Sequence, residues 1–210
     1  MTDPGPLVLA GVLEFLKSAE RLKTTVRSAH TSAGTQESVA EHTWRVCLMA
    51  MVMQPEFPEV DFARLVKICI IHDIGEAIGG DVPAPEQARR KALDPGSAKA
   101  ADERRDLLTL LAPLPHAMRE EITALWDEYE AAVTPEAKLA KALDKLETIL
   151  QHTQGDNPPG FDYRFNLGYG RAFTTGHPLI TEMRRVLDED TERRAVEAQS
   201  GFGVRGPTTS

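Results

Sequence analysis

The sequence predicts an all-α protein that forms a single-domain helical fold with about six or seven helices. Apolar residues recur at helical spacing in most long segments, whereas no segment alternates apolar and polar residues with the period of a strand, and no internal repeat occurs. With 210 residues, of which 41% are hydrophobic, the chain can bury one substantial core. We expect residues 1–198 to form this domain and residues 199–210 to form a disordered tail.

Seven segments carry the pattern of amphipathic helices. They span residues 7–16, 38–53, 61–74, 102–111, 118–133, 135–152 and 178–198. Pro6 suits the start of the first segment, and Ser38 with Glu41 predicts a capping box at the start of the second. Trp44 and Trp126 lie within helical patterns, so we expect both in the core.

The intervening segments lack this periodicity. A polar stretch over residues 28–36 separates the first two helices. Residues 81–97 contain three prolines and few large apolar residues, which predicts a long loop of the kind that often covers a functional site. Residues 156–169 are rich in Gly, Pro, Asn and aromatic residues and are expected to be irregular.

The net charge and the two cysteines indicate which binding partners and which cellular compartment to expect. The formal net charge of −8 argues against binding to nucleic acid polymers or anionic membranes, although a metal and a few basic residues can still attract a small phosphate compound. Cys47 and Cys69 lie in apolar helical segments, as expected of reduced, buried thiols. The chain starts without a signal-peptide pattern and has no long apolar run, so we expect a cytoplasmic protein outside the membrane.

Four residues form the most informative pattern: His42, the adjacent pair His72 and Asp73, and Asp144. Two imidazoles and two carboxylates are suitable donors for a divalent cation, whose charge would balance the two carboxylates. The donor set admits manganese, cobalt, iron, nickel, zinc or magnesium. Each residue also has an ordinary alternative, since a histidine can be a hydrogen-bonded core residue and Asp144 a solvated aspartate.

This spacing resembles that of the HD-domain metal-dependent phosphohydrolases, an all-helical superfamily. The motifs ESVAEH at residues 37–42 and HDIGEAIGGDVP at residues 72–83 are similar to those of the narrower family of HD-domain 5′-deoxynucleotidases. The resemblance implies metal ligation by the four residues above. It also implies that Glu76 acts on the attacking water, that Asp81 approaches the sugar or assists catalysis, and that Arg27 binds the 5′-phosphate.

The implied activity is release of phosphate from (deoxy)nucleoside 5′-monophosphates by metal-activated water. Members of this family are often dimeric, which implies a homodimer. The chain departs from the family where a tryptophan usually follows the arginine, because Ser28, Ala29 and His30 follow Arg27 here. His30 could supply a planar wall beside the ribose, or it could be an ordinary loop residue, so selectivity between ribose and deoxyribose is not predicted.

Three other functions remain as alternatives. HD-domain enzymes that remove pyrophosphate from guanosine tetraphosphate usually carry an acidic residue after the glutamate, where this chain has Ala77. Dinuclear-iron oxygenases of the same fold need two further histidines before the last aspartate, and only His116 lies there. A non-catalytic metal-binding regulatory module would have no chemical need for Glu76. For Arg27 and Glu76, a surface position remains the ordinary alternative.

Overall fold

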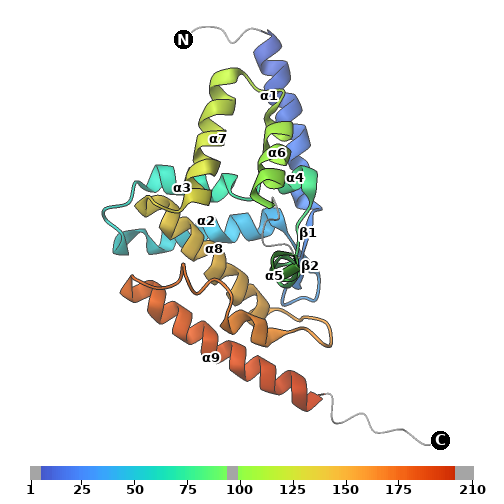
Figure 1. Ribbon diagram of the computed structural model, residues 1–210, viewed down its shortest axis with the longest axis vertical. Helices are drawn as coiled ribbons and strands as arrows, with labels where there is room; N and C mark the ends of the chain where they lie inside the picture. The colour runs from blue at the N-terminus through green and yellow to red at the C-terminus, as the bar shows by residue number, and fades with distance from the viewer. Residues whose placement is uncertain (1–5, 94–98, 202–210) are drawn as a thin grey trace, which may run out of the picture. The chain divides into compact units, whose positions relative to one another are not determined.

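The computed structural model describes residues 6–93 and 99–201 and is predominantly α-helical (Figure 1), which confirms the predicted class. The helices are α1 (Pro6–Ala19), α2 (Val39–Met53), α3 (Phe62–Ile71), α4 (Glu76–Gly79), α5 (Ala84–Leu93), α6 (Lys99–Leu111), α7 (His116–Ala131), α8 (Pro135–Gln154) and α9 (Pro178–Gly201). Three 3-10 turns accompany them, η1 (Glu20–Lys23), η2 (Gln54–Glu56) and η3 (Tyr163–Leu167). A two-stranded sheet pairs β1 (Val26–His30) with β2 (Gln36–Ser38).

The chain divides into two compact units. Among the described residues, the first unit holds residues 6–28, 37–93 and 99–141, and the second holds residues 29–36 and 142–201. Helix α8 therefore begins in the first unit and continues into the second. Of the predicted tail, residues 199–201 belong to α9 and residues 202–210 lie outside the described part of the chain. The single-domain organisation remains a prediction.

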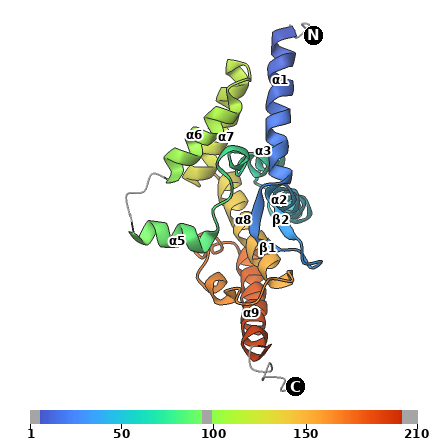
Figure 2. The same ribbon diagram turned by 90° about the vertical axis from the view of Figure 1, so that its right-hand side faces the viewer.

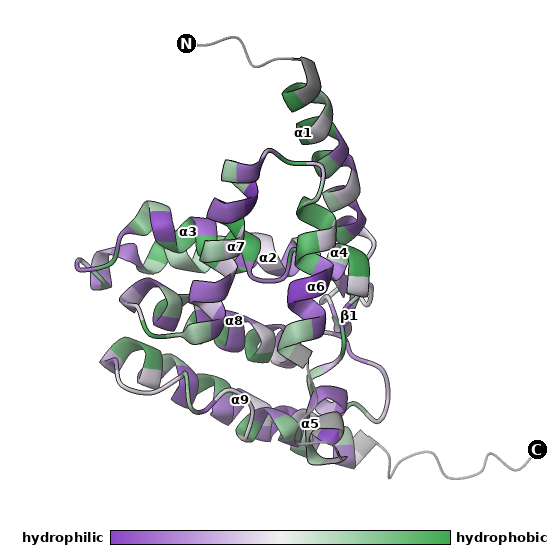
Figure 3. Ribbon diagram, turned by 45° about the horizontal axis from the view of Figure 1, so that its top comes forward, coloured by the Kyte–Doolittle hydropathy of each residue, from purple (hydrophilic) through white to green (hydrophobic). Residues whose placement is uncertain are grey.

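The core of the first unit lies among helices that are distant in sequence. Helix α3 packs against α2 and α7, and α6 packs against α1, α4 and α7 (Figure 2). Each helix mixes hydrophobic and hydrophilic residues along its length (Figure 3), as the predicted amphipathic pattern requires. Large apolar side chains buried almost completely in this unit are Val39, Val46, Leu65, Ile68, Leu107, Leu110 and Leu111.

A glycine sets the close approach of α1 to the turn between α6 and α7. A Cβ atom added to Gly11 would lie 2.0 Å from the carbonyl oxygen of Pro113, a distance that no real side chain tolerates. Glycine is therefore the residue that permits this contact.

Local side-chain interactions start α2, which carries His42, and α3, which directly precedes His72 and Asp73. At α2, Ser38 Oγ accepts a hydrogen bond from the Glu41 amide at 3.2 Å, while Glu41 Oε2 accepts one from the Ser38 amide at 2.7 Å. The predicted capping box is confirmed. At α3, Asp61 Oδ1 accepts from the Arg64 amide at 3.1 Å. These caps satisfy backbone donors and fix where each helix begins.

In the second unit, α9 packs against η3, and one buried arginine holds the irregular segment that precedes this helix. Arg184, which is 4% exposed, donates hydrogen bonds to the carbonyl oxygens of Asn166, Leu167 and Tyr169 and pairs with Asp188 at 2.7 Å. Apart from η3, residues 156–169 are irregular, as predicted.

The expectations for residues 81–97 and for Trp44 were wrong, and the small sheet was not predicted. The predicted loop at residues 81–97 contains α5, because Pro85 falls in the first helical turn, where proline is tolerated, and strong helix formers follow. The polar stretch at residues 28–36 contributes to the small sheet, closed by a hydrogen bond from the Thr31 amide to the Thr35 carbonyl oxygen. Trp44 is 65% exposed, although Trp126 is buried as expected.

None of the helices in the described part of the chain combines the length and the apolar character that crossing a membrane requires.

Candidate metal centre

Two predicted ligands face each other in the first unit. His42 lies one turn into α2 and is fully buried, and His72 follows the last residue of α3 and is also buried. Because α2 packs against α3, the two imidazole rings lie with their centroids 5.4 Å apart. Tyr129 of α7 packs against the His72 ring at a centroid distance of 5.2 Å, which limits its rotation.

Asp73 joins the two histidines. Its Oδ2 atom lies 3.1 Å from His72 Nε2 and 3.7 Å from His42 Nε2. Two imidazole nitrogens and a carboxylate oxygen therefore converge within the first unit. Such a set suits first-row divalent cations, and it comprises three of the four ligands predicted from the sequence.

The hydrogen bonding of His72 prepares one nitrogen for a metal. Its Nδ1 atom lies 2.7 Å from the carbonyl oxygen of Cys69, an acceptor, so Nδ1 carries the proton. Its Nε2 atom is buried and has no hydrogen-bond partner within residues 6–93 and 99–201. A deprotonated Nε2 with the opposite nitrogen held by a carbonyl is the arrangement of a metal-bound histidine. The residues present therefore fit a divalent cation.

Glu76 lies beside this cluster at the start of α4, in a half-buried position. Its Oε2 atom is buried and has no hydrogen-bond partner in the described part of the chain. Burial, followed by the charges of Asp73 and Asp81, raises the pKa of Glu76 to about 10, while Arg27 acts in the opposite direction. Asp81, also predicted as a site residue, is thus electrostatically coupled to Glu76. Glu76 is not an ordinary surface glutamate.

The backbone between His72 and Glu76 differs from the prediction. A continuous helix was expected to residue 74, but α3 ends at Ile71 and tight turns span residues 72–75. Gly75 explains the close passage of these turns along α6, because an added Cβ atom would lie 3.3 Å from the Glu103 carbonyl oxygen and the Leu107 amide. The metal-ligand pair and Glu76 are therefore placed by turns and not by one helix face.

Arg27, in β1, is part of the same cluster. Its NH1 atom lies 3.5 Å from Asp73 Oδ2, and its Nε atom lies 3.4 Å from Glu37 Oε2. The side chain is 12% exposed, which is incompatible with a solvated surface arginine. Arg45 of α2 completes the group, with NH2 3.8 Å from Glu37 Oε1. Neither Glu37 nor Arg45 was predicted as a site residue, although Glu37 begins the motif that ends at His42 and Arg45 follows His42 by three residues.

The remaining predicted residues, Asp144 and His30, belong to the second unit. Asp144 of α8 is 4% exposed and accepts a hydrogen bond from Lys145 at 2.7 Å, so it is not a solvated aspartate. Burial alone would lower the pKa of Lys145, but Asp144, followed by Tyr169, raises it. His30 ends β1, where its amide donates to Asn157 Oδ1 at 2.9 Å. The metal role of Asp144 and the substrate role of His30 remain predictions.

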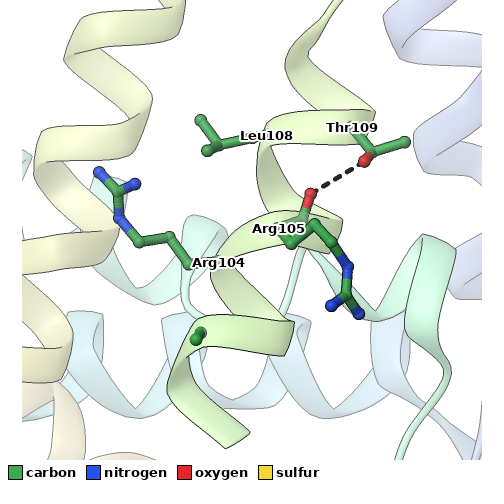
Figure 4. A pocket seen from close by; sticks show the side chains of 5 residues that line it. Arg104, Arg105, Leu108 and Thr109 are labelled. Carbon is green, nitrogen blue, oxygen red and sulfur yellow. Dashed lines mark hydrogen bonds between the residues drawn. The ribbon is translucent and has the colours of Figure 1, made fainter. Parts of the chain in front are cut away.

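A shallow hollow on α6 lies among other residues of the first unit (Figure 4). It is lined by Ala101, Arg104, Arg105, Leu108 and Thr109. Arg104 binds Asp127 through two hydrogen bonds of 2.9 and 3.0 Å, and Arg105 binds Asp102 at 2.6 Å. Both guanidinium groups are therefore engaged by carboxylates, and the hollow shares no residue with the predicted site.

The chain belongs to the HD-domain family, which matches residues 19–183 and thus the whole range of predicted site residues. Among curated proteins, 5′-deoxynucleotidase HDDC2 of Xenopus laevis is 36% identical over 191 residues, covering 89% of this chain and 90% of that protein. The protein of the same name from Mus musculus is 31% identical with the same coverage. A crystal structure described as a predicted metal-dependent phosphohydrolase, from Magnetospirillum magnetotacticum MS-1, is 27% identical with a TM-score of 0.76, covering 93% of this chain and 98% of that one.

Proposed function

We propose that this chain is a metal-dependent 5′-nucleotidase that releases inorganic phosphate from (deoxy)nucleoside 5′-monophosphates. The observation that carries the proposal is the convergence of His42, His72 and Asp73, with His72 Nε2 prepared for a cation. The curated relatives named 5′-deoxynucleotidase support the substrate class.

The proposed metal ligands are His42, His72, Asp73 and Asp144. Asp144 is supported by its burial and by the charge balance between two carboxylates and one divalent cation. When bound, the cation polarises the phosphoryl group and lowers the pKa of water. Manganese, cobalt, iron, nickel, zinc and magnesium all remain compatible with this mixed donor set.

The other site residues act on the water and the substrate. We assign Glu76 to accept a proton from the attacking water, because it lies beside the ligand cluster with a buried carboxylate oxygen. The positive charge of a bound cation would favour the ionised form that this role requires. Arg27 binds the 5′-phosphate, for which a guanidinium is the appropriate charged donor. Asp81 approaches the sugar or assists Glu76, and His30 forms a wall beside the ribose.

We also propose a homodimer that acts in the cytoplasm on a small nucleotide, without binding nucleic acid polymers or membranes. The net charge of −8 disfavours both kinds of polyanionic partner. Within the described part of the chain neither Cys47 nor Cys69 forms a disulfide, as suits a reducing compartment. Support for a dimer comes from α1, whose exposed Leu9, Leu13 and Leu16 recur at helical spacing.

Turnover with metal-reconstituted protein tests the proposal. The metal-free protein is loaded in turn with each of the six cations and incubated with a panel of ribo- and deoxyribonucleoside 5′-monophosphates, with guanosine tetraphosphate as a separate substrate. We expect phosphate release from monophosphates, and a loss of about 100-fold or more in Glu76→Ala with the metal retained.

The other outcomes are distinct. Pyrophosphate release from guanosine tetraphosphate alone would replace the proposed substrate. A metal-loaded protein that turns over none of these compounds would be a non-catalytic module. Equal activity in wild type and Glu76→Ala would remove Glu76 from the mechanism.

A further inference from the structure

Glu37 is a buried carboxylate held between two arginines. Its side chain is 4% exposed, with Oε2 3.4 Å from Arg27 Nε and Oε1 3.8 Å from Arg45 NH2. A buried carboxylate is costly unless cationic partners compensate it, and here both oxygens face one. Nothing in the proposed chemistry yet uses Glu37 or Arg45.

The backbone fixes Glu37 relative to Arg27. The two residues lie on β2 and β1, neighbouring strands of the small sheet. Immediately after Glu37, the capping box at Ser38 starts α2, and the Val39 amide donates to the Thr25 carbonyl oxygen at 2.9 Å. The position of the carboxylate therefore depends on short, hydrogen-bonded elements and not on a free loop.

The guanidinium group of Arg27 spans from Glu37 to the candidate metal centre. Its Nε atom lies within ion-pair distance of Glu37 Oε2, and its NH1 atom lies 3.5 Å from Asp73 Oδ2. A guanidinium is planar, so holding Nε on one partner also restricts where the terminal amino groups point. In this geometry NH1 is directed to the side of the centre that contains Asp73.

We propose that Glu37 is a positioning residue that holds Arg27 in the orientation needed to bind the 5′-phosphate. Arg45 neutralises the same carboxylate, so the trio of Arg27, Glu37 and Arg45 keeps a net charge of about +1 toward an anionic substrate. Without Glu37, Arg27 would keep its charge but would have to be ordered when phosphate binds, which weakens phosphate binding. This inference rests on the proposed function of Arg27.

A double-mutant cycle in the full-length, metal-reconstituted protein tests it. Glu37→Gln preserves shape and removes the charge, and Arg27→Ala removes the group that Glu37 is proposed to position. We expect Glu37→Gln to raise KM and the inhibition constant of inorganic phosphate about tenfold, with a smaller change in kcat. In the Arg27→Ala background the same substitution should change both constants less than about twofold. Glu121→Gln, which removes an exposed ion pair to Lys67, is the matched control and should change neither.

Phosphate binding by calorimetry separates this inference from the proposed function. If no nucleotide is hydrolysed but phosphate still binds with the expected dependence on Glu37, the proposed nucleotidase activity is refuted and the positioning role stands. Unchanged phosphate affinity in Glu37→Gln, an equal loss in both Arg27 backgrounds, or a loss of bound metal would overturn the positioning role. If Glu37→Gln does not fold, as judged by circular dichroism, Glu37→Asp replaces it in the cycle, because the shorter side chain keeps the charge and withdraws it from Arg27. A Glu37→Asp protein with wild-type phosphate affinity would then overturn the role.

Discussion

His72 Nδ1 lies 2.7 Å from the carbonyl oxygen of Cys69, one turn earlier in the chain. This hydrogen bond assigns the proton to Nδ1 and leaves Nε2 as the lone-pair donor, facing Asp73 at 3.1 Å. The last turn of α3 therefore selects the imidazole tautomer that a divalent cation requires.

Replacing His72 should weaken metal binding, and the loss of bound metal should in turn lower the activity. We expect His72→Ala to weaken divalent metal binding by at least about 100-fold, the upper range for loss of an outer-shell partner. His116→Ala is the control, because His116 is an exposed residue of the same unit that pairs with Glu120. Calorimetric titration with Mn²⁺ measures both. Equal affinity in the two variants would exclude His72 from the ligand set.

Glu76 should make the stability of the metal-free protein depend on pH. An unfolded glutamate ionises above about 4.5, whereas folded Glu76 keeps its proton until about 10, so stability falls as pH rises between these values. Glu76→Gln removes this penalty. We expect the free energy of unfolding of Glu76→Gln to exceed that of wild type by a margin that is roughly 1–3 kcal/mol larger at pH 8 than at pH 5. The largest change that one group can give over three pH units is ~4 kcal/mol.

Urea denaturation of the metal-free proteins at several pH values measures this difference. Glu121→Gln again serves as the control, since Lys67 lowers the pKa of exposed Glu121 and no gain with rising pH is expected. A Glu76→Gln advantage that stays constant or shrinks as pH rises would mean that Glu76 ionises normally in the folded protein.

Arg184 should be a large contributor to the stability of the second unit. Arg184→Ala would remove the buried donor to three carbonyl oxygens and to Asp188, leaving exposed Arg171 as a donor to Asp188 and Leu167. We therefore expect a loss of about 3–5 kcal/mol. The adjacent Arg185 is 52% exposed and pairs only with surface glutamates among the contacts described, so Arg185→Ala should change stability by less than about 0.5 kcal/mol. Chemical denaturation compares the two. Similar losses for both would contradict the proposed role of Arg184.

Local patterns were sufficient to predict much of this fold. Helical periodicity depends on neighbours three and four residues apart, so it identified the segments of α2 and α9, and the Ser38–Glu41 cap followed from the same local spacing. The donor chemistry of His42, His72 and Asp73 was equally apparent from residue types. In the structure these three side chains lie close to one another.

The features that were missed are not encoded in hydrophobic periodicity. The hairpin of β1 and β2 is closed by polar interactions such as that between Thr31 and Thr35. The same pairing brings Glu37 to Arg27, so its role could not follow from the motif alone. The turns that follow α3 pass close to α6 at Gly75, which is again a tertiary contact.

The most direct test of the central claim is the stoichiometry and affinity of divalent metal binding in wild type and Asp144→Asn. Calorimetric titration of metal-free protein with Mn²⁺ should give one ion per chain in wild type, and Asp144→Asn should bind that ion at least about tenfold more weakly while keeping its helical circular dichroism. An unchanged affinity in Asp144→Asn, or the absence of a stoichiometric ion in wild type, would contradict a metal centre built from these four side chains.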